Sequence, residues 1–254
     1  MSIILEAEHL TKVFTTKGKE VLKAVDDVSF QLESGEILGI VGESGCGKST
    51  LAKLITRLTD MTSGTLIFDG KDITNLTGRE RKDFYGKIQM VFQNPLTSFD
   101  PRRTLGDGIG ESLRNRGMKK EERNRRITEV LEQAGLSSEF ADRYPHEVSG
   151  GQCQRAAIAR ALAVEPAILI CDEATSALDV TIQKQIMDLL LELKENQGLS
   201  FIFICHNLAL VQMFCDRVLV LYDGKVAESG TTDEIINHPK EEYTKKLIES
   251  ACES

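Results

Sequence analysis

The sequence predicts an α/β fold with a mostly parallel sheet and an inserted helical segment. Two nearly continuous apolar runs, 167–171 and 200–205, are separated by a helical pattern, which is typical of parallel strands covered on both faces. Between 94 and 163 the charge rises and apolar residues recur at helical spacing. A chain of 254 residues is long enough to bury one such core and to carry an insertion.

The first third of the chain is predicted to form short strands. Its β-branched segments alternate with turn signals such as Glu33-Ser34-Gly35. The expected strands are 3–5, 28–32, 36–41, 64–70 and 88–92. Residues 51–55 carry an apolar helical pattern and are expected to form the first helix.

Helices are predicted in the middle of the chain, and a hairpin near its end. An amphipathic stripe at i, i+3, i+4 and i+7 covers 127–134. A second helix carries apolar residues on one side over 182–193 and is expected to end at Gly198. The turn signal Asp223-Gly224 predicts a β-hairpin over 217–230.

Charge and composition exclude several classes of protein. The formal charge of −8 argues against nonspecific nucleic-acid binding, which needs a basic surface. The densest basic segment, 114–126, is interrupted by Glu121 and Glu122 and is interpreted as a solvated helix face. Six cysteines without CxxC spacing predict buried free thiols in a reducing compartment. With no visible signal peptide or membrane-spanning run, the chain itself is expected to be soluble and cytoplasmic.

A glycine-rich motif between a predicted strand and a predicted helix indicates a nucleotide site. It matches GxxxxGK[ST], and its residues are Gly42, Glu43, Ser44, Gly45, Cys46, Gly47, Lys48, Ser49 and Thr50. The glycines let backbone N–H groups surround the β-phosphate. Lys48 is expected to reach the β/γ oxygens, and the Ser49 hydroxyl to bind Mg²⁺.

Two acidic residues follow the buried run 168–171. The strand is expected to place Asp172 at the carboxyl edge of the sheet, where it can hold Mg²⁺ through water. Glu173 is then within reach of a water in line with the γ-phosphate. The alternative is a surface acidic pair that ends a strand, and it is disfavoured because the phosphate loop needs an acid at this edge.

A second phosphate-binding pattern, without a lysine, opens a predicted helix. Its residues are Ser149, Gly150, Gly151 and Gln152. Ser149 and Gln152 match an S-x-x-Q capping box, so helix capping is the alternative interpretation. Capping does not account for two consecutive glycines, which leave backbone amides bare.

In their order along the chain these motifs resemble those of the ATP-binding-cassette (ABC) ATPases. The resemblance covers essentially the whole chain and includes the phosphate loop, Gln93 after a strand, Ser149–Gln152, Asp172-Glu173, Ser176-Ala177-Leu178-Asp179 and His206. It implies one ABC ATPase domain over 1–254, whose P-loop NTPase core (1–93 and 164–235) carries an N-terminal antiparallel β subdomain. A helical subdomain is expected at 94–163 and a short helical tail at 236–254.

The resemblance also implies roles for single residues. Gln93 would touch Mg²⁺ or the attacking water, and His206 would bind the γ-phosphate and orient Glu173. Phe14 would stack on adenine, and Asp179 would belong to the nucleotide site. The alternatives are a solvated glutamine, a structural or exposed histidine, and a core phenylalanine.

In this family the signature 149–152 binds the γ-phosphate held by the other subunit of a head-to-tail dimer. The expected partner is a second ABC ATPase subunit, a paralogue rather than a copy. Segments 91–95 and 98–102 resemble oligopeptide, dipeptide and nickel importer ATPases. The expected function is ATP hydrolysis that drives uptake of peptides or nickel and metal chelates. Two permease subunits at the cytoplasmic face of the cell membrane and, indirectly, a substrate-binding protein complete the expected partners.

Some features depart from the family pattern. Val148, Ala174 and Asn207 replace commoner residues, and they are expected to alter loop stiffness or rate without removing a catalytic group. The sequence ends soon after Tyr243 without the cysteine cluster of many peptide importers, which favours metal chelates. An exporter subunit remains an alternative. A cassette ATPase acting on DNA or ribosomes is disfavoured by the acidic charge.

Overall fold

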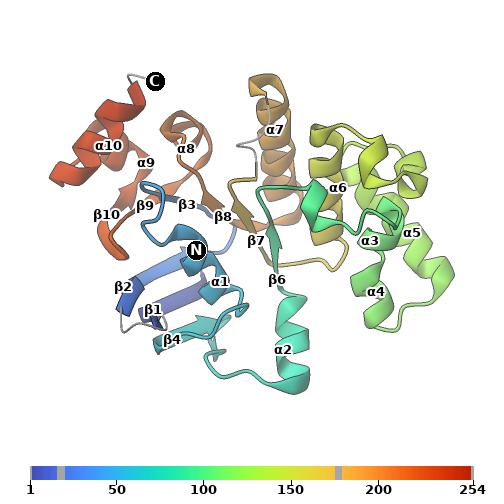
Figure 1. Cartoon of the computed structure of the whole chain (residues 1–254), viewed down its shortest axis with the longest axis horizontal. Coiled ribbons are helices and arrows are strands. Elements are labelled where there is room, and N and C mark those ends of the chain that lie inside the picture. Colours follow the sequence, from blue (N-terminus) through green and yellow to red (C-terminus); the bar gives the residue numbers. More distant parts are fainter. Residues whose placement is uncertain (1, 16–20, 175–178, 253–254) are drawn as a thin grey trace. The chain divides into compact units, whose positions relative to one another are not determined.

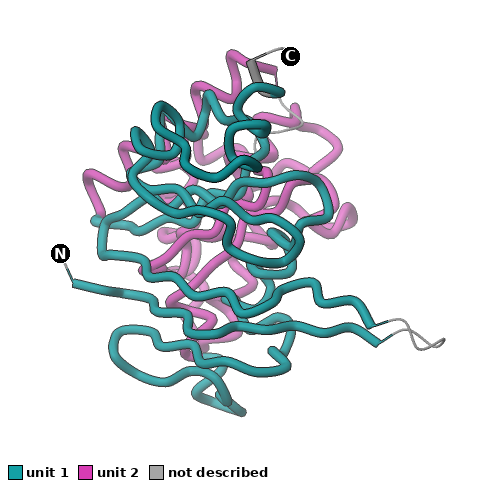
Figure 2. The backbone as a smooth tube through the Cα atoms, turned by 90° about the vertical axis from the view of Figure 1, so that its left-hand side faces the viewer, with its two compact units in different colours: residues 1–82, 198–254 teal, residues 83–197 magenta. Residues whose placement is uncertain are grey.

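The structure is a computed structural model that describes residues 2–15, 21–174 and 179–252. The chain divides into two compact units, coloured separately in Figure 2. Unit 1 comprises residues 1–82 and 198–254, and unit 2 comprises residues 83–197.

Parallel strands form the centre of unit 1. β3 (Ile37–Val41) lies between β8 (Ser200–Ile204) and β9 (Arg217–Tyr222) and pairs in parallel with both. β10 (Lys225–Thr231) adds to β9 in the antiparallel direction, and the predicted turn at residues 223–224 joins the two strands. All residues of β3 and β8 are buried, which explains their nearly continuous apolar sequence. The loops that follow these two strands therefore leave from the same edge of the sheet.

Helices of unit 1 follow β3, β8 and β10 along the chain, and the last of these is followed by a further helix (Figure 1). They are α1 (Lys48–Ile55), α8 (Leu208–Phe214), α9 (Thr232–Asn237) and α10 (Glu242–Cys252). α1 buries Leu51, Leu54 and Ile55, the apolar positions from which this helix was predicted. It starts earlier than expected because the glycine-rich loop turns directly into its first residue.

Unit 1 also contains an antiparallel sheet in the order β2-β1-β4-β5. Its strands are β1 (Ile3–Thr15), β2 (Val21–Glu33), β4 (Ser63–Phe68) and β5 (Lys71–Asp72). The predicted strands 3–5 and 28–32 were much too short, since β1 and β2 pair over nearly their whole length in a long ribbon (Figure 2). Register shifts along this pairing disturb the alternation of apolar residues, so the pattern alone did not reveal the ribbon.

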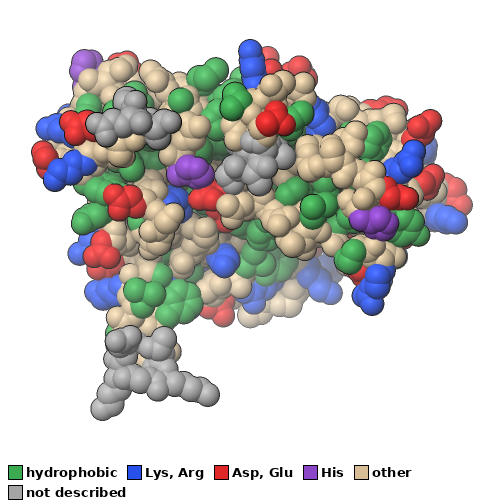
Figure 3. Space-filling model, turned by 45° about the horizontal axis from the view of Figure 1, so that its top comes forward, with side chains coloured by type: hydrophobic (Ala, Val, Ile, Leu, Met, Phe, Trp, Pro, Cys, Tyr) green, Lys and Arg blue, Asp and Glu red, His purple; other side chains and the backbone are tan. Residues whose placement is uncertain are grey.

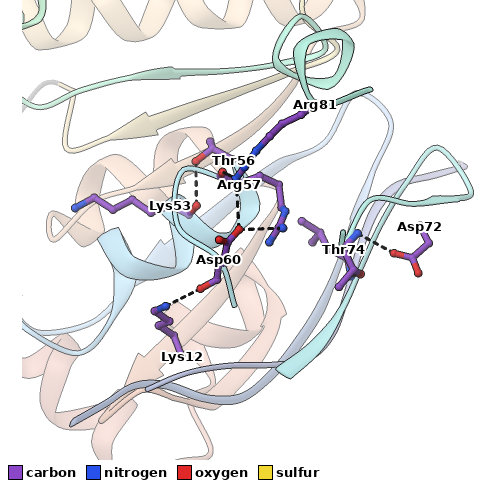
Figure 4. Close-up of polar contacts among 9 residues, drawn as sticks. Lys12, Lys53, Thr56, Arg57, Asp60, Asp72, Thr74 and Arg81 are labelled. Atoms are coloured by element: carbon purple, nitrogen blue, oxygen red, sulfur yellow. Dashed lines mark hydrogen bonds and ion pairs between the residues drawn. The ribbon is translucent and has the colours of Figure 1, made fainter. Parts of the chain in front are cut away.

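Polar contacts hold the far end of α1 against the antiparallel sheet (Figure 4). Arg57 follows α1 with a left-handed backbone (φ 56°), and its guanidinium donates to Asp60 Oδ1 at 3.2 Å. Lys12 Nζ, on β1, donates to the Asp60 carbonyl at 2.7 Å. Arg81 Nη2 donates to the Arg57 carbonyl at 2.7 Å. These contacts fix α1 at its C-terminal end. The glycine-rich loop lies at the other end of the same helix, so its position depends on them.

Unit 2 combines a parallel strand pair with helices. β6 (Ile88–Val91) and β7 (Ile168–Asp172) pair in register, from Ile88 opposite Ile168 to Val91 opposite Cys171. The helices between these strands are α3 (Leu105–Ile109), α4 (Glu111–Asn115), α5 (Lys120–Gln133) and α6 (Gly150–Leu162), and α7 (Val180–Gln197) follows β7. α2 (Gly78–Tyr85) begins in unit 1, ends in unit 2 and precedes β6. 3-10 turns occupy Leu96–Ser98, Ser138–Asp142 and Pro145–Glu147.

The predicted helices of unit 2 are confirmed. α5 buries Ile127, Val130 and Leu131 of the predicted stripe, and Ala134 caps its C-terminus. α7 ends immediately before Gly198, whose φ of 64° is the left-handed conformation expected after a helix. The fold class is likewise confirmed, with parallel strands, an antiparallel sheet and a run of helices within 94–163. Within the described ranges, no helix has both the length and the apolar character needed to span a membrane.

Candidate nucleotide site

The glycine-rich loop 42–47 joins β3 to α1 and is packed tightly by backbone. Gly42 has a φ of 148°, and a Cβ at this position would lie 2.2 Å from the carbonyl oxygen of Leu221, in β9. Gly47 has a φ of 109°, and its Cβ would lie 2.2 Å from the carbonyl oxygen of Ala24, in β2. Glycine is therefore required at both ends of the loop for steric as well as conformational reasons.

The loop surrounds a buried cation. Lys48 is 6% exposed, and its Nζ donates to the carbonyl oxygens of Gly42 at 2.7 Å and Glu43 at 2.8 Å. It also lies 3.8 Å from Cys46 Sγ, a weak acceptor. The N-terminus of α1 has no side-chain cap and no acidic residue in its first turn. The positive end of this helix and the lysine together favour an anion at the loop.

In unit 2 the carboxyl ends of β6 and β7 bring Gln93 and Glu173 together. The strands are neighbours, so the residues that follow them lie side by side, and Gln93 Nε2 donates to Glu173 Oε2 at 2.8 Å. Gln93 is exposed, yet this bond makes it more than a solvated loop residue. Glu173 has a left-handed backbone with φ of 48°, a conformation that costs on the order of 1 kcal/mol for a non-glycine residue. Such strain often accompanies a functional position.

The predicted capping box at the start of α6 is present. Ser149 Oγ accepts from the Gln152 N–H at 3.3 Å, and Gln152 Oε1 accepts from the Ser149 N–H at 2.9 Å. Packing also favours glycine at one of the two positions, because a Cβ at Gly151 would lie 2.7 Å from Ile182 Cγ2 in α7. The expectation that only ligand binding accounts for the glycine pair is therefore corrected for Gly151.

An open cavity of about 450 Å³ lies beside this helix start. Its lining includes Ser149, Gly151, Gln152 and Arg155. The Arg155 guanidinium donates to the Ala134 carbonyl at 3.0 Å, which holds the side chain at the cavity wall. The signature residues thus border a space that is open to an incoming group.

The other predicted residues have distinct surroundings. Phe14 lies inside β1 and is 41% exposed, with Lys12 Nζ 5.0 Å from the ring centroid, so the core alternative is wrong. His206 is exposed, two positions after the end of β8. Asn207 caps α8 by accepting from the Ala209 and Leu210 N–H groups.

The segment before α7 is only partly described. Asp179 is exposed, and its Oδ1 accepts from the Ile182 N–H at 3.0 Å near the start of the helix. Its motif partners Ser176, Ala177 and Leu178 lie outside the described residues.

Two contacts at the glycine-rich loop were not predicted. The Glu43 N–H donates to Tyr243 Oη at 3.1 Å, and the Gly224 N–H donates to the Cys46 carbonyl at 3.0 Å. In each contact the partner of the loop, Tyr243 or Gly224, comes from the C-terminal part of unit 1. Tyr243 is 200 positions away from Glu43. No local pattern in the sequence could indicate such a pair.

The predicted magnesium ligands have suitable chemistry. Ser49, Gln93 and Asp172 offer a hydroxyl, an amide and a carboxylate oxygen, all donors of the type that Mg²⁺ prefers. Mg²⁺ commonly uses one or two carboxylates together with substrate phosphates. The described residues contain no group of three His, Cys, Asp or Glu side chains that could hold a metal alone. Each predicted donor therefore has the chemistry of a magnesium ligand, and their binding of one ion shared with a nucleotide stays a prediction.

The cysteines take no part in this donor set. The five cysteines with described side chains are buried free thiols, as predicted. Burial raises the pKa of the Cys171 thiol, next to Asp172, to about 12. This thiol therefore stays neutral at physiological pH, and a neutral thiol is a poor metal ligand.

Charged side chains are mixed on the molecular surface. On the face drawn in Figure 3, basic and acidic side chains are interspersed among the described residues. The prediction that nucleic acid is not a partner continues to rest on the formal charge of −8.

Comparison with protein families and curated proteins gives consistent results. The family described as ABC transporter matches residues 25–176. The oligopeptide transport ATP-binding protein OppF of Bacillus subtilis (strain 168) is 46% identical over 248 residues, which cover 96% of this chain and 81% of that protein. The di/tripeptide transport ATP-binding protein DppF of Pseudomonas aeruginosa (strain UCBPP-PA14) is 42% identical over 254 residues, covering 98% and 79%.

Solved structures resemble the fold closely. The ATP-binding cassette MJ0796, described as dimeric in a post-hydrolysis state with ADP and Pi, matches with a TM-score of 0.82 and 33% identity over 90% of this chain and 99% of that chain. The cbiO1 protein of Clostridium perfringens, part of the ABC transporter complex cbiONQ, matches with a TM-score of 0.83 and 28% identity over 94% and 92%.

Proposed function

Because this chain belongs to the ABC transporter family and is the ATP-hydrolysing subunit of an importer, we propose that it drives peptide uptake with ATP and Mg²⁺ bound at residues 42–50. The buried Lys48 is the observation that carries this site. A lysine enclosed by loop carbonyls, at the uncapped start of a helix whose first turn has no acidic residue, offers its charge to phosphate oxygens.

The proposed chemistry is in-line attack of water on the γ-phosphate. In a loose phosphoryl-transfer transition state, positioning and electrostatics supply most of the catalysis. Glu173 orients the water and accepts its proton, and its hydrogen bond with Gln93 fixes the carboxylate. Asp172 and Ser49 would hold Mg²⁺, which would supply positive charge to stabilise the negative charge that develops on the phosphate oxygens. His206 steadies the γ-phosphate, and Phe14, exposed on β1, offers a face for adenine.

A complete site is proposed to need two cassettes. The signature residues Ser149–Gln152 carry no lysine, and they border an open cavity rather than a filled one. We assign them to the γ-phosphate held by a second ABC ATPase subunit, together with Asp179. The dimeric state in which MJ0796 is described supports this arrangement, and the pairing typical of related importers favours a paralogue.

The proposed cargo and membrane partners follow from the relatives. Those reported above are named for oligopeptides and di/tripeptides, which favours peptides over nickel or metal chelates. Two permease subunits would carry the peptide, with this subunit on the cytoplasmic face of the membrane. We propose that the loop around residues 93–102, together with the helical insertion, receives a permease helix. Phe92, just before this loop, and Leu96 within it expose apolar surface, and the Arg102 guanidinium is oriented by Asp100.

Titration with labelled ATP tests the site. Lys48→Ala is expected to abolish ATP binding, because it removes the cation at the β/γ oxygens. Lys53→Ala is the matched control, since Lys53 is an exposed lysine on the same helix. Undiminished affinity in the Lys48 variant would exclude residues 42–50 as the nucleotide site.

A further inference from the structure

The peptide unit between Gly42 and Glu43 connects the C-terminal helix to the lysine of the phosphate loop. Its N–H, on Glu43, donates to Tyr243 Oη at 3.1 Å. Its carbonyl oxygen, on Gly42, accepts from Lys48 Nζ at 2.7 Å. A trans peptide is planar, and its N–H and C=O point in opposite directions. Rotation of this one plane would therefore break both hydrogen bonds together.

The tyrosine hydroxyl is itself held in place. Tyr243 is at the start of α10, and its ring packs on Tyr222 at the end of β9, with centroids 4.2 Å apart. The turn after β9 also binds the loop, through the Gly224 N–H and the Cys46 carbonyl. Burial raises the pKa of Tyr243, so the phenol stays neutral and accepts the amide hydrogen at physiological pH. The acceptor is thus fixed by packing that lies outside the loop.

The peptide plane needs such an anchor. Gly42 lacks a side chain and has a φ of 148°, in a region that few other residues adopt, so the plane can rotate more freely than in an ordinary residue. Lys48 depends on the orientation of this plane. Two of its three ammonium donors go to the carbonyls of Gly42 and Glu43, and these carbonyls fix the direction of the third donor. That donor faces only a weak acceptor within the loop, Cys46 Sγ at 3.8 Å, which a phosphate oxygen can replace.

We propose that Tyr243 is a positioning residue for ATP binding. Through the Gly42–Glu43 peptide it fixes the carbonyl that holds the Lys48 ammonium, and thereby directs the remaining donor of Lys48 at the phosphates. Tyr243 itself touches no atom of the nucleotide. The inference rests on the proposed function of residues 42–50 as the ATP site.

Tyr243→Phe in the full chain tests this role. The substitution removes the hydroxyl and keeps the ring that packs on Tyr222. The dissociation constant and the KM for ATP are expected to rise about two- to tenfold, as for the loss of one neutral hydrogen bond. The kcat at saturating ATP and the melting temperature should stay close to those of the wild type. Tyr222→Phe is the matched control, because it removes the other hydroxyl of the same ring pair, and both constants should remain unchanged.

The outcomes separate this inference from the proposed function. Wild-type affinity in Tyr243→Phe, while Lys48→Ala fails to bind ATP, would overturn the role of Tyr243 alone. A fall in kcat and melting temperature without a rise in the ATP constants would also overturn it, since the hydroxyl would then only support the packing of α10. Failure of the wild type itself to bind labelled ATP would instead refute the proposed site.

Discussion

Glu173 combines three properties at a single residue. It follows a buried strand, its backbone is left-handed, and its carboxylate accepts a hydrogen bond from Gln93. Because β6 and β7 are neighbouring parallel strands, the glutamine amide and the carboxylate are held by the sheet rather than by a flexible loop alone. This arrangement suits a base that must hold one orientation toward a water molecule.

Glu173→Gln keeps the shape of the side chain and removes its charge and basicity. ATP hydrolysis is expected to fall at least about a hundredfold, the lower end of what a positioned base supplies. ATP should still bind and, since it is not consumed, hold two cassettes together. Phosphate release and size-exclusion chromatography with ATP, in the presence of the paralogous partner where the pair is mixed, measure both effects.

Glu165→Gln is the matched control for this experiment. Glu165 is an exposed acid of unit 2 that also has a left-handed backbone, with φ of 54°. Its replacement should leave hydrolysis unchanged. Asp172→Asn should instead weaken Mg²⁺ binding, so a magnesium titration distinguishes the two neighbouring acids. Near-normal turnover of Glu173→Gln, without an ATP-dependent dimer, would refute the catalytic role.

Among the elements, α6 combines a structural and a functional feature at its first turn. The Ser149–Gln152 capping box satisfies two backbone donors at the helix start. A capping box of the same kind opens α9, where Thr231 and Glu234 exchange equivalent bonds. Only the α6 box belongs to the proposed signature, so the two helices allow capping to be separated from binding.

Ser149→Ala and Thr231→Ala should each lower the free energy of unfolding by about 0.5–2 kcal/mol, since each removes an N-cap side chain. Only Ser149→Ala is expected to reduce ATP hydrolysis by the assembled pair of cassettes, because the serine is also proposed to contact the phosphate held by the other subunit. Chemical denaturation and steady-state hydrolysis measure the two effects. Equal loss of activity in both variants would show that Ser149 acts only as a helix cap.

For the whole molecule, the proposed sharing of each ATP between two chains predicts a dependence on concentration. If each ATP needs both motifs from different chains, the isolated subunit should hydrolyse ATP slowly. The activity per molecule should rise steeply as the protein, or its paralogous partner, is concentrated. Hydrolysis measured alongside light scattering tests this, and a constant specific activity of a monomer across a wide dilution series would contradict it.

The sequence by itself determined the local features of this protein. The glycine-rich loop, the Asp172-Glu173 pair, the capping box of α6 and the stop of α7 at Gly198 were all predicted from residues close together in the chain. Each depends on short-range geometry, such as the backbone freedom of glycine or the reach of a side chain to a nearby amide. The alternation of apolar strands and helices likewise determined the fold class, because burial on both faces of a parallel sheet leaves a direct mark on the sequence.

Only the tertiary structure decided which distant residues meet. β1 and β2 extend far beyond their predicted lengths because each supplies the hydrogen-bond partners of the other. Gln93 reaches Glu173 because β6 pairs with β7, and Tyr243 reaches the phosphate loop because its ring packs on the end of β9. Phe14 is exposed, although an aromatic side chain is equally suited to a buried core. Contacts of this kind depend on how strands pair and helices pack, and a single sequence carries no local signal for them.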